Sequence, residues 1–217
     1  MKDLSLQYIS RAPKVANADP PVLILLHGYG SNEQDLFSFA EELPDEFLII
    51  SARAPLSLMP GSYAWYAIHF DNVDGKFSDI PQARRARDTI AQFIDEIKET
   101  YQVDASKTFL LGFSQGTILS YSVALTYPEK VNYVIALSGY INEELLPESL
   151  DKERYNHLDF FISHGSVDQV LPVDWARRAK PFLDSLSIPS EYHEYPVGHG
   201  VAPQNFYEFK AWLDKRL

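Results

Sequence analysis

Apolar residues along the chain fall into short continuous runs and into longer stretches with helical spacing. Runs of strand length predict buried strands, and the alternation over residues 4–9 predicts an edge strand. Apolar residues that recur every three or four positions predict helices between them. The predicted strands are at 22–26, 47–51, 108–111, 133–138, 158–163 and 190–195, and the predicted helices are at 31–40, after Pro81, and at 115–127, 173–186 and 206–217.

Strands that alternate with helices in this order are typical of a mostly parallel sheet with helices on both faces. We therefore predict the α/β class, with a single mostly parallel sheet of about seven strands flanked by helices. No linker rich in proline, glycine or serine divides the 217 residues, so the sequence predicts one domain over residues 1–217.

Five residues, Gly112-Phe113-Ser114-Gln115-Gly116, join a predicted buried strand to a predicted helix and match the pattern G-x-S-x-G. A serine at such a tight strand-to-helix turn presents its hydroxyl at the edge of the sheet as a nucleophile. The glycines keep Cβ atoms out of the crowded turn. Ser114 is therefore the candidate nucleophile, and the alternative is a glycine-bounded turn that carries a solvated serine.

A serine nucleophile needs a base, and histidine is the side chain suited to accept its proton near neutral pH. His199, flanked by two glycines after the last predicted strand, is the candidate among the six histidines. Asp168 follows the strand at 158–163 and is the candidate acid that holds the imidazole. Asp174 competes with it but lies in a first helical turn, where the helix dipole explains an acidic residue. His164 ends the same strand, and we interpret it as shaping the loop that bears Asp168.

The same chemistry needs two backbone N–H groups that stabilise negative charge on a substrate oxygen. Gln115 supplies one, because it opens the helix directly after Ser114. The loop after the strand at 22–26 supplies the second in this arrangement, and we predict the N–H of Tyr29, between Gly28 and Gly30.

Composition narrows the class of protein. The net charge is −11 and the basic residues are scattered, which disfavours a nucleic acid or an anionic membrane as partner. The sequence contains no cysteine, which excludes a thiolate metal site and a cysteine nucleophile. No apolar run has the length of a membrane span or a signal peptide core, so we expect a cytoplasmic protein without stable membrane insertion.

With these residues in view, the chain resembles the α/β-hydrolase superfamily and is similar to its small phospholipase/carboxylesterase family, which includes acyl-protein thioesterases. The resemblance covers about residues 22–213 and includes Arg53-Ala54-Pro55 and His164-Gly165. It implies the α/β-hydrolase fold and a serine carboxylesterase that needs no cofactor or metal and acts on small-molecule esters. The triad order Ser114, Asp168, His199 agrees with this fold. An acyl thioesterase or lysophospholipase, or a noncatalytic ligand-binding module of the same fold, is the alternative.

Residues 52–79 show neither the alternation of a strand nor the spacing of a helix, and they mix prolines and glycines with aromatic and aliphatic side chains. Long loops of this kind tend to be functional. We predict that apolar side chains of this stretch line a groove for short to medium acyl chains. The alternative is a loop whose side chains pack onto the domain. The predicted substrate-binding residues are Leu58, Met59, Trp65 and Tyr66. The sequence leaves open the physiological substrate and whether two copies form a homodimer.

Overall fold

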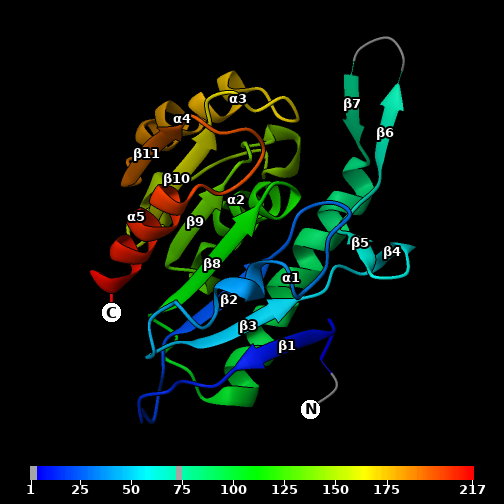
Figure 1. Ribbon diagram of the computed structural model, residues 1–217. Coiled ribbons are helices and arrows are strands. Elements are labelled where there is room, and N and C mark those ends of the chain that lie inside the picture. The colour runs from blue at the N-terminus through cyan, green and yellow to red at the C-terminus, as the bar shows by residue number, and fades with distance from the viewer. Residues whose placement is uncertain (1–3, 72–74) are drawn as a thin grey trace.

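The computed structural model describes residues 4–71 and 75–217 and contains a seven-stranded sheet (Figure 1). The strand order is β1-β3-β2-β8-β9-β10-β11. Only the edge strand β1 is antiparallel to its neighbour, so the sheet is mostly parallel, as the alternation of strands and helices predicts. The strands are β1 (Tyr8–Arg11), β2 (Val22–Leu26), β3 (Leu48–Ala52), β8 (Thr108–Phe113), β9 (Tyr133–Leu137), β10 (Asp159–Gly165) and β11 (Ser190–Tyr195).

Helices cover both faces of this sheet, because alternate residues of each central strand point to opposite sides. In β2, Val22, Ile24 and Leu26 join one apolar core, whereas Leu23 and Leu25 join the other. The first core takes side chains from α1 (Ile80–Tyr101), α2 (Gln115–Thr126) and α4 (Ala179–Ser185). The second takes them from α5 (Pro203–Asp214). Within residues 4–71 and 75–217, no helix is both long and apolar enough to cross a bilayer.

Two predicted helices differ in the structure. The segment after Ser31 forms only the 3₁₀ helix Leu36–Phe39, since Ser31 is held extended by a bridge to Tyr63, whose N–H donates to the Ser31 carbonyl at 2.8 Å. The helix predicted over 173–186 is divided into α3 (Val173–Arg177) and α4. Pro181 explains the break, because proline lacks an N–H and clashes with the carbonyl four residues before it.

The stretch without a period, residues 52–79, forms two hairpins outside the main sheet. The first pairs β4 (Leu56–Met59) with β5 (Ser62–Ala64), and the second pairs β6 (Ile68–Asp71) with β7 (Gly75–Ser78). Figure 1 shows the second hairpin extending away from the body of the molecule. Residues 72–74 of the predicted loop lie outside the described residues. Three further 3₁₀ helices complete the fold, at Pro128–Lys130, Glu143–Leu145 and Lys152–Tyr155.

Candidate active site

Ser114 lies at the turn between β8 and α2 with φ 53° and ψ −115°, a backbone conformation that residues other than glycine rarely adopt. The turn is tight because α2 packs directly on the sheet. A Cβ on Gly116 would lie 2.0 Å from the carbonyl oxygen of Leu26, and one on Gly112 would lie 2.6 Å from Gly116. Glycine is therefore required at both positions for the sharp turn that presents the Ser114 hydroxyl.

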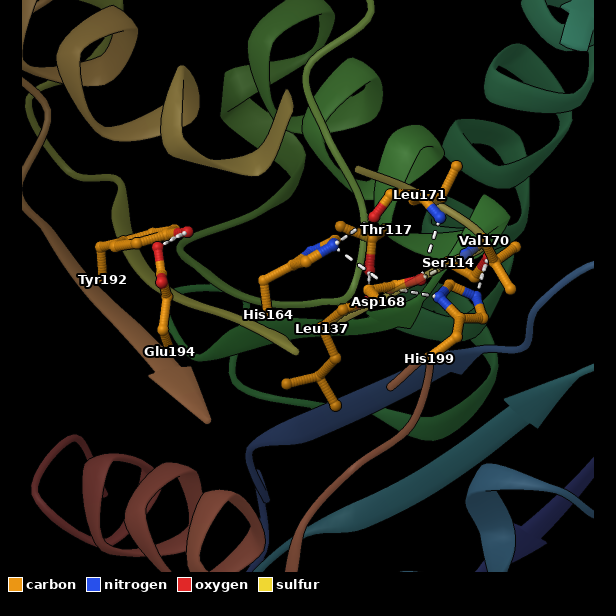
Figure 2. A network of polar contacts seen from close by, with 10 residues as sticks. All are labelled: Ser114, Thr117, Leu137, His164, Asp168, Val170, Leu171, Tyr192, Glu194 and His199. Atoms are coloured by element: carbon orange, nitrogen blue, oxygen red, sulfur yellow. Dashed lines mark hydrogen bonds and ion pairs between the residues drawn. The ribbon is translucent and has the colours of Figure 1, made fainter. Parts of the chain in front are cut away.

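Three side chains from separate parts of the chain meet at the carboxyl edge of the sheet (Figure 2). Ser114 Oγ lies 2.9 Å from Nε2 of His199, and Nδ1 of His199 lies 2.6 Å from Oδ2 of Asp168. Because Nδ1 faces a carboxylate, that nitrogen carries the ring proton, and Nε2 is left to accept the hydrogen bond of the serine. The structure thus brings together the three residues that the sequence singles out.

The side chain of Asp168 is fully buried, and its carboxylate is held by hydrogen bonds. Its Oδ1 accepts from the backbone N–H groups of Val170 at 2.7 Å and Leu171 at 2.9 Å. Burial alone would raise the pKa of Asp168, but the hydrogen bonds from His199 and from these two amides outweigh it and hold the pKa below its usual value. Asp168 therefore remains a carboxylate at neutral pH and can balance positive charge on His199.

The loop with the predicted oxyanion donor passes directly beside the nucleophile. A Cβ on Gly28 would come within 3.3 Å of the Ser114 Cβ, and Tyr29 lines the same pocket as Ser114 and Gln115. The Gln115 N–H belongs to the first turn of α2 and has no partner within the helix. Among the described residues, neither this N–H nor that of Tyr29 donates a hydrogen bond. Both groups are free to bind a substrate oxygen.

His27 holds this loop in place through hydrogen bonds. Its Nε2 accepts from the Ala54 N–H at 3.1 Å, so Nδ1 carries the proton and donates to the Gly28 carbonyl at 2.8 Å. Burial lowers the pKa of His27, which favours this neutral form. The Trp65 indole donates to the His27 carbonyl at 2.9 Å. The supporting role of His27 and Trp65 was not predicted from the sequence, because nothing in their spacing indicates the hydrogen bond between them.

The Gln115 side chain ties the excursion of residues 52–79 to the nucleophile turn. Its amide oxygen accepts from the Trp65 N–H at 2.8 Å, and its amide nitrogen donates to the Tyr66 carbonyl at 2.9 Å. The side chain is only 2% exposed, so these buried backbone groups depend on it. Gln115 therefore has a structural task besides the N–H that it presents to the pocket.

A pocket of about 180 Å³ opens beside Ser114, and its walls are mainly apolar. Of the four predicted substrate-binding residues, only Tyr66 lines it. Trp65 is 2% exposed and belongs to the core, while Leu58 and Met59 are 37% and 63% exposed on the first hairpin, which corrects the expectation for these three. The pocket is lined by Tyr29, Tyr66, Ile68, Ser78, Ser114, Gln115, Ile118, Tyr140, Val170, Leu171, Trp175 and His199.

Several lining residues that sequence reasoning missed follow the carboxyl ends of strands. Tyr140 comes after β9, and Val170, Leu171 and Trp175 come after β10. The rule that ligands bind at the carboxyl edge of a parallel sheet, which singles out Asp168 and His199, applies equally to these side chains. Applied to every strand end, that rule could have identified these lining residues from the sequence.

Comparisons with known proteins show which family the chain belongs to. The sequence model of the family described as phospholipase/carboxylesterase matches residues 12–217. Acyl-protein thioesterase 1 of Debaryomyces hansenii is 27% identical, with 97% of this chain and 98% of the relative covered. A probable carboxylesterase of Oryza sativa subsp. japonica is 26% identical over 90% of this chain and 77% of the relative.

Solved structures of esterases are similar to this chain in fold. The crystal structure of esterase PE8 has a TM-score of 0.81 and 26% identity, and all of both chains is covered. The Bacillus cereus carboxylesterase has a TM-score of 0.80 at 20% identity, with 98% of this chain and 95% of that chain covered. At that identity the second likeness concerns the fold alone.

The two candidate acids are distinguished by a matched pair of variants. We expect Asp168→Asn to lower kcat for p-nitrophenyl butyrate by about 10⁴-fold, because an amide cannot balance the imidazolium or fix its tautomer. Asp174→Asn should stay within a few-fold, since the Asp174 carboxylate is 75% exposed and pairs with Arg177 at 2.8 Å. Steady-state kinetics of both purified variants check this, and a larger loss in the Asp174 variant would refute the assignment.

Proposed function

Because the chain belongs to the phospholipase/carboxylesterase family, whose members hydrolyse esters, we propose that it is a serine carboxylesterase acting on short to medium acyl esters. Ser114 is the nucleophile, His199 the base and Asp168 the acid. The observation that carries this proposal is the hydrogen-bonded line from Ser114 Oγ through the His199 imidazole to Asp168, with steps of 2.9 and 2.6 Å. Few arrangements other than covalent catalysis require a strained serine beside a partly buried histidine and a buried carboxylate.

The reaction proceeds in two halves. Nε2 of His199 takes the Ser114 proton as Oγ attacks the ester carbonyl carbon, and the imidazolium then gives that proton to the departing alcohol. The acyl group remains on Ser114. Water deprotonated by His199 attacks the acyl carbon, and collapse of the second intermediate releases the carboxylic acid and restores the serine hydroxyl. Asp168 holds the imidazole and balances its charge in both halves.

The oxyanion of each tetrahedral intermediate is bound by the N–H groups of Tyr29 and Gln115. Both stand at the pocket beside Ser114, and the first turn of α2 adds its dipole at the same place. A single donor of this kind typically contributes about 10²- to 10³-fold in rate. The hydrogen bonds of His27 and of the Gln115 side chain keep the two donors in place before substrate binds.

The shape of the pocket supports short to medium acyl groups. Its walls are mainly aromatic and aliphatic, so each buried methylene contributes binding energy. A T-shaped pair, Tyr140 and Trp175, with ring centroids 5.0 Å apart, stands between it and a second cavity of about 270 Å³. Both side chains line both cavities. The pair therefore forms a partition that limits the acyl length.

Thioester hydrolysis is the second candidate, because several relatives are acyl-protein thioesterases. The same acyl-serine serves both reactions, and only the leaving group differs. Matched oxygen and sulfur esters of one acyl group separate the two, through their kcat/KM ratio after correction for uncatalysed hydrolysis. A ratio strongly in favour of sulfur would assign the thioesterase.

Removal of the nucleophile tests the proposed function directly. Ser114→Ala should remain folded and hydrolyse p-nitrophenyl butyrate at the background rate, because the chain has no cysteine that could replace the serine. Ser122→Ala is the matched control: this buried serine lies in the same helix, but its hydroxyl donates to the Leu145 carbonyl. Most of the wild-type kcat in the Ser114 variant would rule out the proposed mechanism.

Removal of the partition tests the acyl length. With esters from acetate to palmitate, kcat/KM of the wild type should rise by up to about fourfold per carbon until the pocket is full, and then fall. Trp175→Ala should move the optimum to longer chains, because it joins the two cavities. Phe182→Ala, which changes only the second cavity, should keep the wild-type optimum. An unchanged optimum in the Trp175 variant would contradict the partition.

A further inference from the structure

A second histidine touches the acid of the triad. His164, near the end of β10, is 1% exposed, and Figure 2 shows Asp168 between it and His199. Its Nε2 lies 3.2 Å from Oδ2 of Asp168 and 2.9 Å from the carbonyl oxygen of Leu171. His164 thus contacts both the carboxylate and the loop that follows it.

The surroundings of the ring place its proton. Both oxygen atoms near Nε2 can only accept, so this nitrogen carries the hydrogen; it donates to the Leu171 carbonyl and lies 3.2 Å from Oδ2 of Asp168. Nδ1 is buried and has no hydrogen-bond partner among the described residues. A proton there would be a buried donor without an acceptor, which is unfavourable. His164 therefore presents its Nε2–H next to Asp168.

This donor lies beside a carboxylate that three hydrogen bonds already hold. Oδ1 of Asp168 accepts from two backbone amides, and Oδ2 accepts from His199 and lies 3.2 Å from Nε2 of His164. A carboxylate offers about four acceptor positions on its two oxygens. Hydrogen bonds fill three of them, and the Nε2–H of His164 is the polar group next to Oδ2.

Other charged groups near His164 are already paired. On β11, Glu194 lies in register with His164, and its carboxylate accepts from the Arg177 guanidinium at 2.7 and 2.9 Å and from the Tyr192 hydroxyl at 2.9 Å. The other neighbouring strand, β9, is apolar at its near end, Leu137. Among these neighbours, His164 therefore acts on Asp168 and, through Asp168, on His199.

We propose that His164 is a positioning residue of the triad: its Nε2–H fixes the Asp168 carboxylate and sets how strongly that carboxylate stabilises the imidazolium of His199. This inference rests on the proposed serine mechanism. The positive end of the N–H dipole beside Asp168 opposes a positive charge on His199. Loss of the donor would therefore stabilise the imidazolium and shift the acid limb of the kcat/KM profile to higher pH.

Three substitutions separate this role from a merely structural one. The amide nitrogen of glutamine lies as many bonds from Cα as Nε2 of histidine, so His164→Gln keeps a donor at that place. The amide nitrogen of asparagine reaches only the Nδ1 position, and leucine has no donor. His164→Asn and His164→Leu therefore remove the contact with Asp168 while a side chain still fills the site.

The experiment is a kcat/KM profile with p-nitrophenyl butyrate from pH 5 to 9 for the wild type and the three variants, with circular dichroism and Tm as the fold control. The asparagine and leucine variants should lose about tenfold or more in kcat, as expected when an outer hydrogen-bond partner is removed. The midpoint of their acid limb should rise by a few tenths of a pH unit. The glutamine variant should keep the wild-type midpoint and a kcat within about threefold.

Two results would overturn the inference: equal losses in the glutamine and asparagine variants, or an unshifted acid limb in the asparagine variant. The comparison of glutamine with asparagine decides even where the leucine variant does not fold. An inactive Ser114→Ala protein together with unchanged His164 variants would overturn this inference alone. An active Ser114→Ala protein would overturn the serine mechanism itself.

Discussion

The close approach of α2 to the sheet is the constraint on which the site depends. The backbone of Gly116 lies so near the Leu26 carbonyl that no side chain fits there, and the chain must turn at Ser114 with a positive φ. Such a conformation costs about 1 to 3 kcal/mol and persists only where its surroundings hold it. Here the Ser114 N–H donates to the Leu137 carbonyl at 2.9 Å, and the Thr117 hydroxyl lies 2.6 Å from the same oxygen. Burial of α2 on both sides supplies the stabilisation that offsets the strain.

The parallel sheet collects the remaining groups, because the loops after its strands all emerge at one edge. The loop after β2 carries the Tyr29 N–H, the loop after β10 carries Asp168, and the loop after β11 carries His199. The first two of these loops are held by buried polar contacts. His27 and Trp65 order the first, and His164 and the backbone amides order the second. The candidate site therefore depends on buried polar contacts beneath the groups that line it.

Most strands, and the three side chains that meet as the candidate triad, were predictable from the sequence, because each leaves a local sign. A buried strand is a continuous apolar run, the nucleophile turn has two fixed glycines, and Asp168 and His199 directly follow strands. The hairpins in 52–79 and the core position of Trp65 leave no such sign. Trp65 packs in the core, and its indole donates to the carbonyl of His27, 38 residues away in sequence. The predicted helix after Ser31 is wrong for the same reason, since pairing with Tyr63 overrides the local capping pattern.

In the mechanism we propose, His199 activates Ser114 for covalent chemistry. Phenylmethylsulfonyl fluoride reacts with activated serines, and peptide mapping by mass spectrometry locates the sulfonyl group. We expect one group per chain, on Ser114, in the wild type, and a rate of labelling lowered by orders of magnitude in His199→Gln, because glutamine cannot take the serine proton. Labelling at another residue, or an equal rate in the His199 variant, would contradict it.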